Sequence, residues 1–137
     1  MSGKIFYAAA GMGGKVTARA LVASDGFSAR YDLDRIAGIF SRPEHKLAGE
    51  SYRGRVLVLD AAKGGVATAW MLHEMTARGV VPAALVMNRA NPIMVQGAAL
   101  AGFTMISDFG LDITKAIPNG AEVEVDPTGE RPFIRVL

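Results

Sequence analysis

The stretch Arg55-Val56-Leu57-Val58-Leu59-Asp60-Ala61-Ala62-Lys63-Gly64-Gly65 decides the fold. Its first half is a continuous apolar run, which predicts a buried β-strand. Its glycines predict a turn, and the apolar-periodic run that starts at Val66 predicts a helix. The free N–H groups of a first helical turn, at the positive end of the helix dipole, favour anions. We therefore expect Lys63, Gly64 and Gly65 either to bind a carboxylate or phosphate or simply to join the strand to the helix.

The rest of the chain predicts further strands around this unit. Runs of apolar or alternating residues predict strands at 5–10, 15–24, 83–87, 104–106, 121–126 and 133–137. Helical spacing and an Asn-Pro start predict helices over 66–78 and from Pro92 to about Ala101. Parallel strands joined by helices form right-handed units. The sequence thus predicts one α/β domain over residues 1–137, with three layers (β/β/α) and a central βαβαβ unit.

The long stretch at residues 25–51 has no sustained periodicity and is predicted to be a loop, with a short turn of helix near Ile36. Loops of this length in a compact domain are often binding elements. His45 in this loop could serve as a general acid–base group or as a hydrogen-bonded structural residue. Ser51 fits a turn better than a nucleophile, because the sequence shows no base beside it.

Asp32 and Asp34 lie in the same stretch, next to Tyr31. On a strand the two carboxylates would share one face, where they could bind a metal or transfer protons. A solvated loop is the simpler interpretation, and we assign no metal ligand. Tyr31 is a candidate for proton transfer.

Composition narrows the classes of function. Half of the 137 residues are apolar, the formal net charge is +2, and there is no cysteine. The chain by itself therefore cannot form a disulfide, a thiolate zinc site or a cysteine-ligated iron–sulfur cluster. It shows no basic stripe with interleaved aromatics, no apolar segment of bilayer length and no secretory signal. We expect a soluble, cytoplasmic protein that binds neither nucleic acid nor membrane.

Several motifs match, in order and spacing, those of a known family. They are His45-Lys46-Leu47-Ala48-Gly49-Glu50-Ser51, Gly54–Leu59, Gly79–Val86, Asn91-Pro92-Ile93, Gly97 and Ala98. From about Gly14 to Val125 the chain resembles the small, swivelling-domain subunit of the aconitase X hydro-lyases, whose first motif is His-Pro-Leu-x-Gly-Glu-Ser. The resemblance implies a swivelling β/β/α fold and a heterodimer with a larger, cysteine-bearing subunit that carries an iron–sulfur cluster. It also implies dehydration of a small anionic hydroxy acid, such as mevalonate 5-phosphate or cis-3-hydroxy-L-proline.

Two departures from the family pattern affect the expected active site. Where the family has Arg-Gly-Ser, with the Ser as base, this chain has Lys63-Gly64-Gly65, and Gly65 has no side chain to accept a proton. The family's Ser-Phe-Trp-Gly-Gly-Val-Asp-Pro corresponds to residues 28–35, in which only Ser28 and Asp34 match.

The resemblance implies a set of substrate-binding residues: Ser28, Asp34, Ser51, Lys63, Gly64 and Gly65. It implies that Tyr31, His45 or the partner supplies the base in place of the missing Ser. The chain would then be the small subunit of a dehydratase, inactive without its large subunit, or an isomerase subunit of the same family. The alternative is a non-catalytic module that binds an anion or scaffolds a partner.

Overall fold

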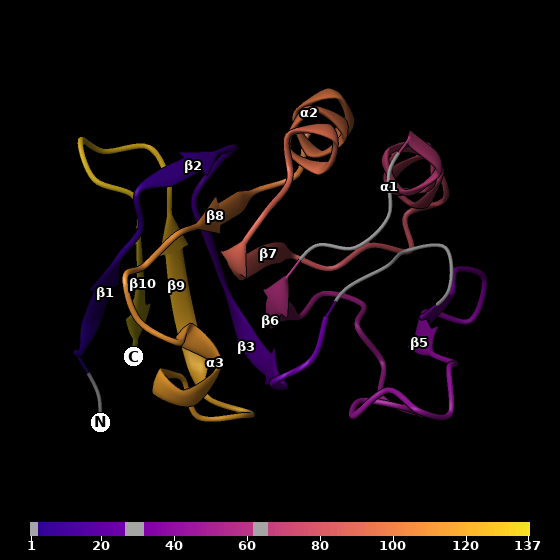
Figure 1. The fold of residues 1–137 in the computed structure, drawn as a ribbon, viewed down its shortest axis with the longest axis horizontal. Helices are drawn as coiled ribbons and strands as arrows, with labels where there is room; N and C mark the ends of the chain where they lie inside the picture. Colours follow the sequence, from indigo (N-terminus) through magenta and orange to yellow (C-terminus); the bar gives the residue numbers. More distant parts are fainter. Residues whose placement is uncertain (1–2, 27–31, 62–65) are drawn as a thin grey trace.

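Residues 3–26, 32–61 and 66–137 are described in the computed structural model (Figure 1). Its elements, in chain order, are β1 (Ile5–Tyr7), β2 (Ala10–Met12), β3 (Val16–Val22), β4 (Leu33–Asp34), β5 (Ile39–Phe40), β6 (Val56–Ala61), α1 (Val66–Arg78), β7 (Ala84–Arg89), α2 (Pro92–Ala101), β8 (Met105–Ser107), α3 (Ile113–Ala116), β9 (Glu122–Asp126) and β10 (Phe133–Val136). No helix in these ranges is long and apolar enough to cross a membrane.

Eight of the strands form one sheet in the order β1-β10-β9-β3-β6-β7-β8-β2. Strands β3, β6, β7 and β8 are parallel to their neighbours in this set, and the remaining pairs are antiparallel. The apolar stretch quoted first is the central strand β6. Its residues 56–59 are all buried, because both faces of the sheet are covered at this point.

The two faces of β6 belong to different layers. Leu57 and Leu59 pack in a core with Leu72 and Met75 of α1, so the helices cover one face. Val56 and Val58 point the other way, since side chains alternate along a strand. They join a second core built from strands β9 and β10: Val123, Val125, Ile134 and Val136. Figure 1 shows α1 and α2 together above β6 and β7, and β1, β9 and β10 grouped at the left of the molecule. The predicted three-layer β/β/α fold is confirmed.

The N-terminal strand differs from the prediction of one strand over residues 5–10. It divides into β1 and β2, which pair with β10 and β8 at opposite ends of the strand order. Gly11 is inside β2. A Cβ atom at Gly11 would lie 2.8 Å from Pro132 Cβ and 3.0 Å from Ile106 Cγ2, so glycine permits a close approach of the backbone here.

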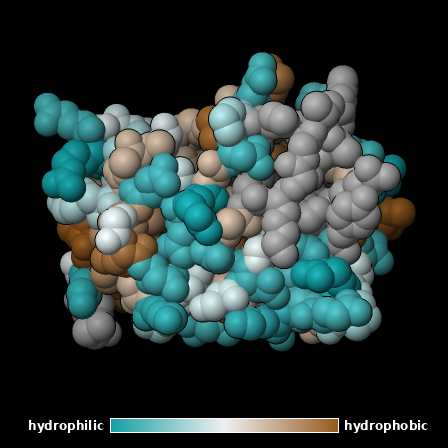
Figure 2. All heavy atoms as spheres, viewed as in Figure 1, coloured by the Kyte–Doolittle hydropathy of each residue, from teal (hydrophilic) through white to brown (hydrophobic). Residues whose placement is uncertain are grey.

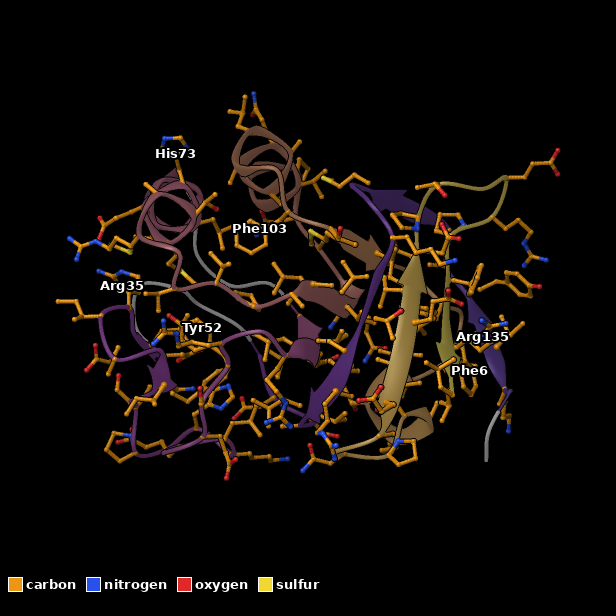
Figure 3. The ribbon with its side chains drawn as sticks, turned by 180° about the vertical axis from the view of Figure 1, so that it is seen from behind. Phe6, Arg35, Tyr52, His73, Phe103 and Arg135 are labelled. Carbon is orange, nitrogen blue, oxygen red and sulfur yellow. The ribbon has the colours of Figure 1, made fainter. Side chains whose placement is uncertain are left out.

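Residues 32–52 form a small lobe instead of the predicted plain loop. Strands β4 and β5 pair as a hairpin, and Ile36 lies in its turn with 75% of its surface exposed. The expected turn near Ile36 is present as a single turn rather than a helix: the Gly38 N–H donates to the Asp34 carbonyl at 2.9 Å. Local hydrogen bonds stabilise this turn: the Asp34 carboxylate accepts the backbone N–H groups of Ile36 and Ala37, each at 3.0 Å. Phe40 and Tyr52 are fully buried inside the lobe, where their rings meet edge to face (Tyr52 in Figure 3).

Candidate functional site at the carboxyl ends of the parallel strands

Polar residues gather where β3, β6 and β7 end. Asp25 follows β3, Asp60 is near the end of β6, and Asn88 is near the end of β7. The backbone N–H of Asp60 donates to the Asp25 carbonyl at 2.8 Å, and Asn88 Nδ2 donates to Asp60 Oδ1 at 2.9 Å. In open α/β sheets, ligands bind beyond the carboxyl ends of the strands. This edge is therefore the candidate site.

The Asn88 side chain links this edge to α3. Its Nδ2 donates a second bond to Asp112 Oδ1 at 2.8 Å, and its Oδ1 accepts the backbone N–H of Ile113 at 2.8 Å. Asp112 caps α3, because its carboxylate accepts the Thr114 hydroxyl and the Thr114 backbone N–H. These bonds, from the Thr114 hydroxyl first and from Asn88 second, lower the pKa of Asp112. Ser24 extends the network through its hydroxyl, which lies 2.8 Å from that of Thr114.

His45 is buried at the same edge. Its Nδ1 accepts the backbone N–H of Leu47 at 3.0 Å, and its Nε2 lies 2.9 Å from the carbonyl oxygen of Gly26. Because a backbone N–H can only donate and a carbonyl can only accept, these contacts assign the neutral ring with its proton on Nε2. The ring also stacks on Phe40, with centroids 4.6 Å apart. Both nitrogens are thus engaged by the chain's own backbone.

Two carboxylates approach the same ring nitrogen. His45 Nε2 lies 3.8 Å from Asp25 Oδ2 and 3.9 Å from Asp32 Oδ2. Asp25 accepts the backbone N–H groups of Gly26 (2.8 Å) and Lys46 (3.1 Å). Asp32 is only 2% exposed and pairs with Arg42 Nε at 2.6 Å. A buried carboxylate is stable only when it is paired in this way. The simple interpretation of a solvated loop therefore does not hold for Asp32.

The sequence-predicted residues are distributed as follows. Five of them lie outside the described residues: Ser28, Tyr31, Lys63, Gly64 and Gly65.

Asp34 and Ser51 are described, and both are exposed. They lie on opposite sides of Ile39, which pairs with Asp34 in the hairpin and with Ser51 in an isolated bridge. The backbone N–H groups of Ala37 and Ile36 lower the pKa of Asp34. In the described part of the chain, no group of three His, Asp or Glu side chains is placed to hold a metal ion.

Sequence reasoning missed Asp60, Asn88 and Asp112. For Asp60 and Asn88 the available signal was an acid or amide at the end of a predicted parallel strand, but their convergence with Asp112, the cap of α3, depends on the fold. A separate open cavity of about 430 Å³, lined in part by Tyr7, Asp108 and Arg131, contains none of the predicted site residues. Among the coloured residues in Figure 2, hydrophilic side chains predominate along the lower half of this face, and hydrophobic ones gather at its left.

Comparison with known proteins agrees with this architecture. The family model described as "Aconitase X swivel domain" matches residues 5–134. The chain is 31% identical over 116 residues to the phosphomevalonate dehydratase small subunit of Methanocella arvoryzae, covering 85% of this chain and 88% of that one. It is 34% identical over 115 residues to the protein of the same name from Methanopyrus kandleri, covering 84% and 85%.

Solved structures show the same fold. Aconitase X from Thermococcus kodakaraensis, in its holo form, superposes with a TM-score of 0.88 at 24% identity, covering 98% of this chain and 99% of that one. The chain belongs to the aconitase X swivel-domain family. The resemblance inferred from its motifs is confirmed, and the expected hydro-lyase subunit agrees with the names of these relatives.

Proposed function

We propose that this chain is the small subunit of an aconitase X-type hydro-lyase, and that phosphomevalonate is the first substrate to test. The observation that carries the proposal is the 31–34% identity to phosphomevalonate dehydratase small subunits over most of both chains. A small subunit requires a larger partner. The chain has no cysteine, so thiolate ligands for an iron–sulfur cluster must come from that partner.

The polar edge would face the cleft shared with the large subunit. Lys63, Gly64 and Gly65 follow β6 directly in the chain, and Asp60 at the end of β6 is held by Asn88 and by the backbone of Asp25. We propose that Lys63 and neighbouring amides bind the phosphate or the carboxylate of the substrate, with Ser28, Asp34 and Ser51 as further substrate contacts. A lysine acts as a point charge where the family's arginine binds bidentately.

The reaction removes a proton from the carbon next to the carboxylate and hydroxide from the following carbon, which forms a C=C bond and releases water. The partner's cluster would supply the Lewis acid for the leaving hydroxyl. The proton acceptor on this chain cannot be Gly65. His45 would have to give up its bond from the Leu47 N–H to accept a proton at Nδ1, so we rank Tyr31 or a group of the large subunit ahead of His45.

The Gly65 departure supports a second candidate, a branch of the family with another role. The subunit could act on a different hydroxy acid, such as cis-3-hydroxy-L-proline, catalyse isomerisation by elimination and re-addition of water, or bind an anion without catalysis. Each of these differs from the first proposal in which substrate, if any, the purified complex converts.

The test is co-expression with the large subunit encoded in the same genome and anaerobic purification of the complex. We expect a stable heterodimer that converts mevalonate 5-phosphate to an unsaturated acid, measured by ultraviolet absorbance and mass spectrometry. The large subunit alone is the control and should be inactive. Turnover of hydroxyproline only would support the second candidate. A complex that turns over neither substrate would leave the non-catalytic module, and absence of any complex would overturn the proposal.

A further inference from the structure

His45 contacts the described residue on one side of residues 27–31 and lies close to the described residue on the other side. Gly26 is the last described residue before that segment and Asp32 is the first after it. The ring donates from Nε2 to the Gly26 carbonyl and lies 3.9 Å from the Asp32 carboxylate. Segment 27–31 contains Ser28 and Tyr31, two residues that the proposed function places at the substrate.

Gly26, the last described residue before 27–31, is bound through both its N–H and its carbonyl. The Gly26 N–H donates to Asp25 Oδ1 at 2.8 Å, and its carbonyl accepts from His45. The other oxygen of Asp25 accepts the N–H of Lys46 at 3.1 Å. The residues that follow β3 are therefore bound to the 45–46 region through both a side chain and the backbone.

Asp32, the first described residue after 27–31, is bound by residues of the same part of the chain. Asp32 pairs with Arg42 Nε at 2.6 Å, and the backbone carbonyl of Asp32 accepts the N–H of Ser41 at 2.8 Å. A short turn, in which the N–H of His45 donates to the Arg42 carbonyl at 3.0 Å, fixes the distance between the two holding side chains.

A third link connects this arrangement to β6. The Asp25 carbonyl accepts the N–H of Asp60, one residue before the end of the strand that leads to Lys63. Both sequence-predicted parts of the site, 28–31 and 63–65, thus begin or end within two or three residues of atoms bonded to this cluster.

We propose that His45 is a positioning residue: together with Asp25, Asp32 and Arg42 it forms a clasp that holds Gly26 and Asp32, the described residues on either side of 27–31, beside the end of β6. The inference rests on the proposed function for the role of that segment, but the clasp itself is a property of this chain. His45 acts through the backbone of Gly26, with its ring neutral and its proton on Nε2. The competing role, that of a general acid–base group, requires a nitrogen free to exchange a proton with substrate.

The first test measures the ring itself in the full-length chain. We expect ¹⁵N NMR at neutral pH to show an unprotonated Nδ1 and a protonated Nε2 for His45, and slow exchange of the Leu47 amide. A charged ring, or a proton on Nδ1, overturns the clasp. This measurement needs no variant to fold and no substrate to be turned over.

The second test uses the complex with its large subunit. His45→Asn can retain an acceptor for the Leu47 N–H but cannot reach Gly26, and His73→Gln is the matched control, since His73 is the other histidine and lies exposed on α1 (Figure 3). We expect kcat/KM to fall about 10- to 100-fold with His45→Asn, mostly through KM, with the pH profile of kcat unchanged and no rescue by imidazole. The control should retain wild-type kinetics.

Loss of a limb of the pH profile, with a kcat about 100- to 10,000-fold lower and partial rescue by imidazole, would show an acid–base role and overturn the inference. If the wild-type complex turns over no substrate, the proposed function fails, and the ring spectra alone then decide the clasp. Wild-type kinetics in His45→Asn would also overturn it.

Discussion

Asn88 and Asp112 are joined by a hydrogen bond of 2.8 Å that connects the end of β7 to the start of α3. The same amide nitrogen donates to Asp60, so one neutral side chain separates two carboxylates. The edge of the sheet that we assign to the site depends on this neutral donor.

Replacing the donor should destabilise the edge. Asn88→Asp removes both donated bonds and places a third carboxylate between Asp60 and Asp112. We expect a loss of about 1–3 kcal/mol in the free energy of unfolding at pH 7, measured by urea denaturation, with a smaller loss near pH 4. Asn119→Asp is the control, because the side-chain oxygen of Asn119 accepts the Val22 N–H and aspartate retains that oxygen. Equal stability of the two variants would contradict the network.

Acid should weaken the cap of α3. The pKa of Asp112 is lowered in the folded chain, first by the Thr114 hydroxyl and next by Asn88. A group with a depressed folded pKa stabilises above its unfolded pKa, about 3.9, and loses that contribution as the pH falls through the folded value. We therefore expect Asp112→Asn to lower the melting temperature at pH 7 and to reduce its fall below about pH 4. Glu130→Gln, in the β9–β10 loop, controls for the loss of one carboxylate; an identical pH response of both variants would refute the prediction.

Gly11 should tolerate no side chain. A Cβ atom there would lie 2.8 Å from Pro132 Cβ and 2.9 Å from Pro132 Cγ, and the proline ring cannot rotate away. We expect Gly11→Ala to destabilise the chain by about 1–3 kcal/mol in denaturant unfolding. Gly14→Ala is the matched control, because its Cβ would meet no atom within 4 Å. A control that is destabilised as strongly would show that packing at β2 is not the cause.

Gly65 offers a direct test of the altered base. If the cleft is otherwise that of the family, Gly65→Ser should restore a proton acceptor and raise turnover of mevalonate 5-phosphate by the complex, by up to about 100- to 10,000-fold, the usual contribution of such a group. Gly65→Ala adds a side chain of similar size without a hydroxyl and should not raise turnover. Equal rates for both variants and the wild type would indicate that another group already serves as base.

Sequence patterns predicted the layers well, whereas most of the predicted site residues lie outside the described part of the chain. The apolar run of β6 and the helical spacing after it are local signals, and they correctly gave the parallel core. The Asn88 network joins residues 24 to 28 positions apart, so no local pattern contains it. His45 was open to two interpretations because its burial against Phe40 and its bonds to Gly26 and Leu47 arise only after residues 32–52 fold as a lobe.

The N-terminal strands β1 and β2 have a consequence for how cooperatively the sheet unfolds. β1 and β2 occupy the two outermost positions of the sheet, yet only Ala8 and Ala9 separate them, and these two residues bond to Pro132 and to Asp108 on either side. Residues 5–12 thus pair with both β10 and β8, whose outer backbone groups would otherwise be unpaired and open to other molecules. Detaching them would uncover β10 and β8 together, so the two β layers should open as one unit rather than one after the other.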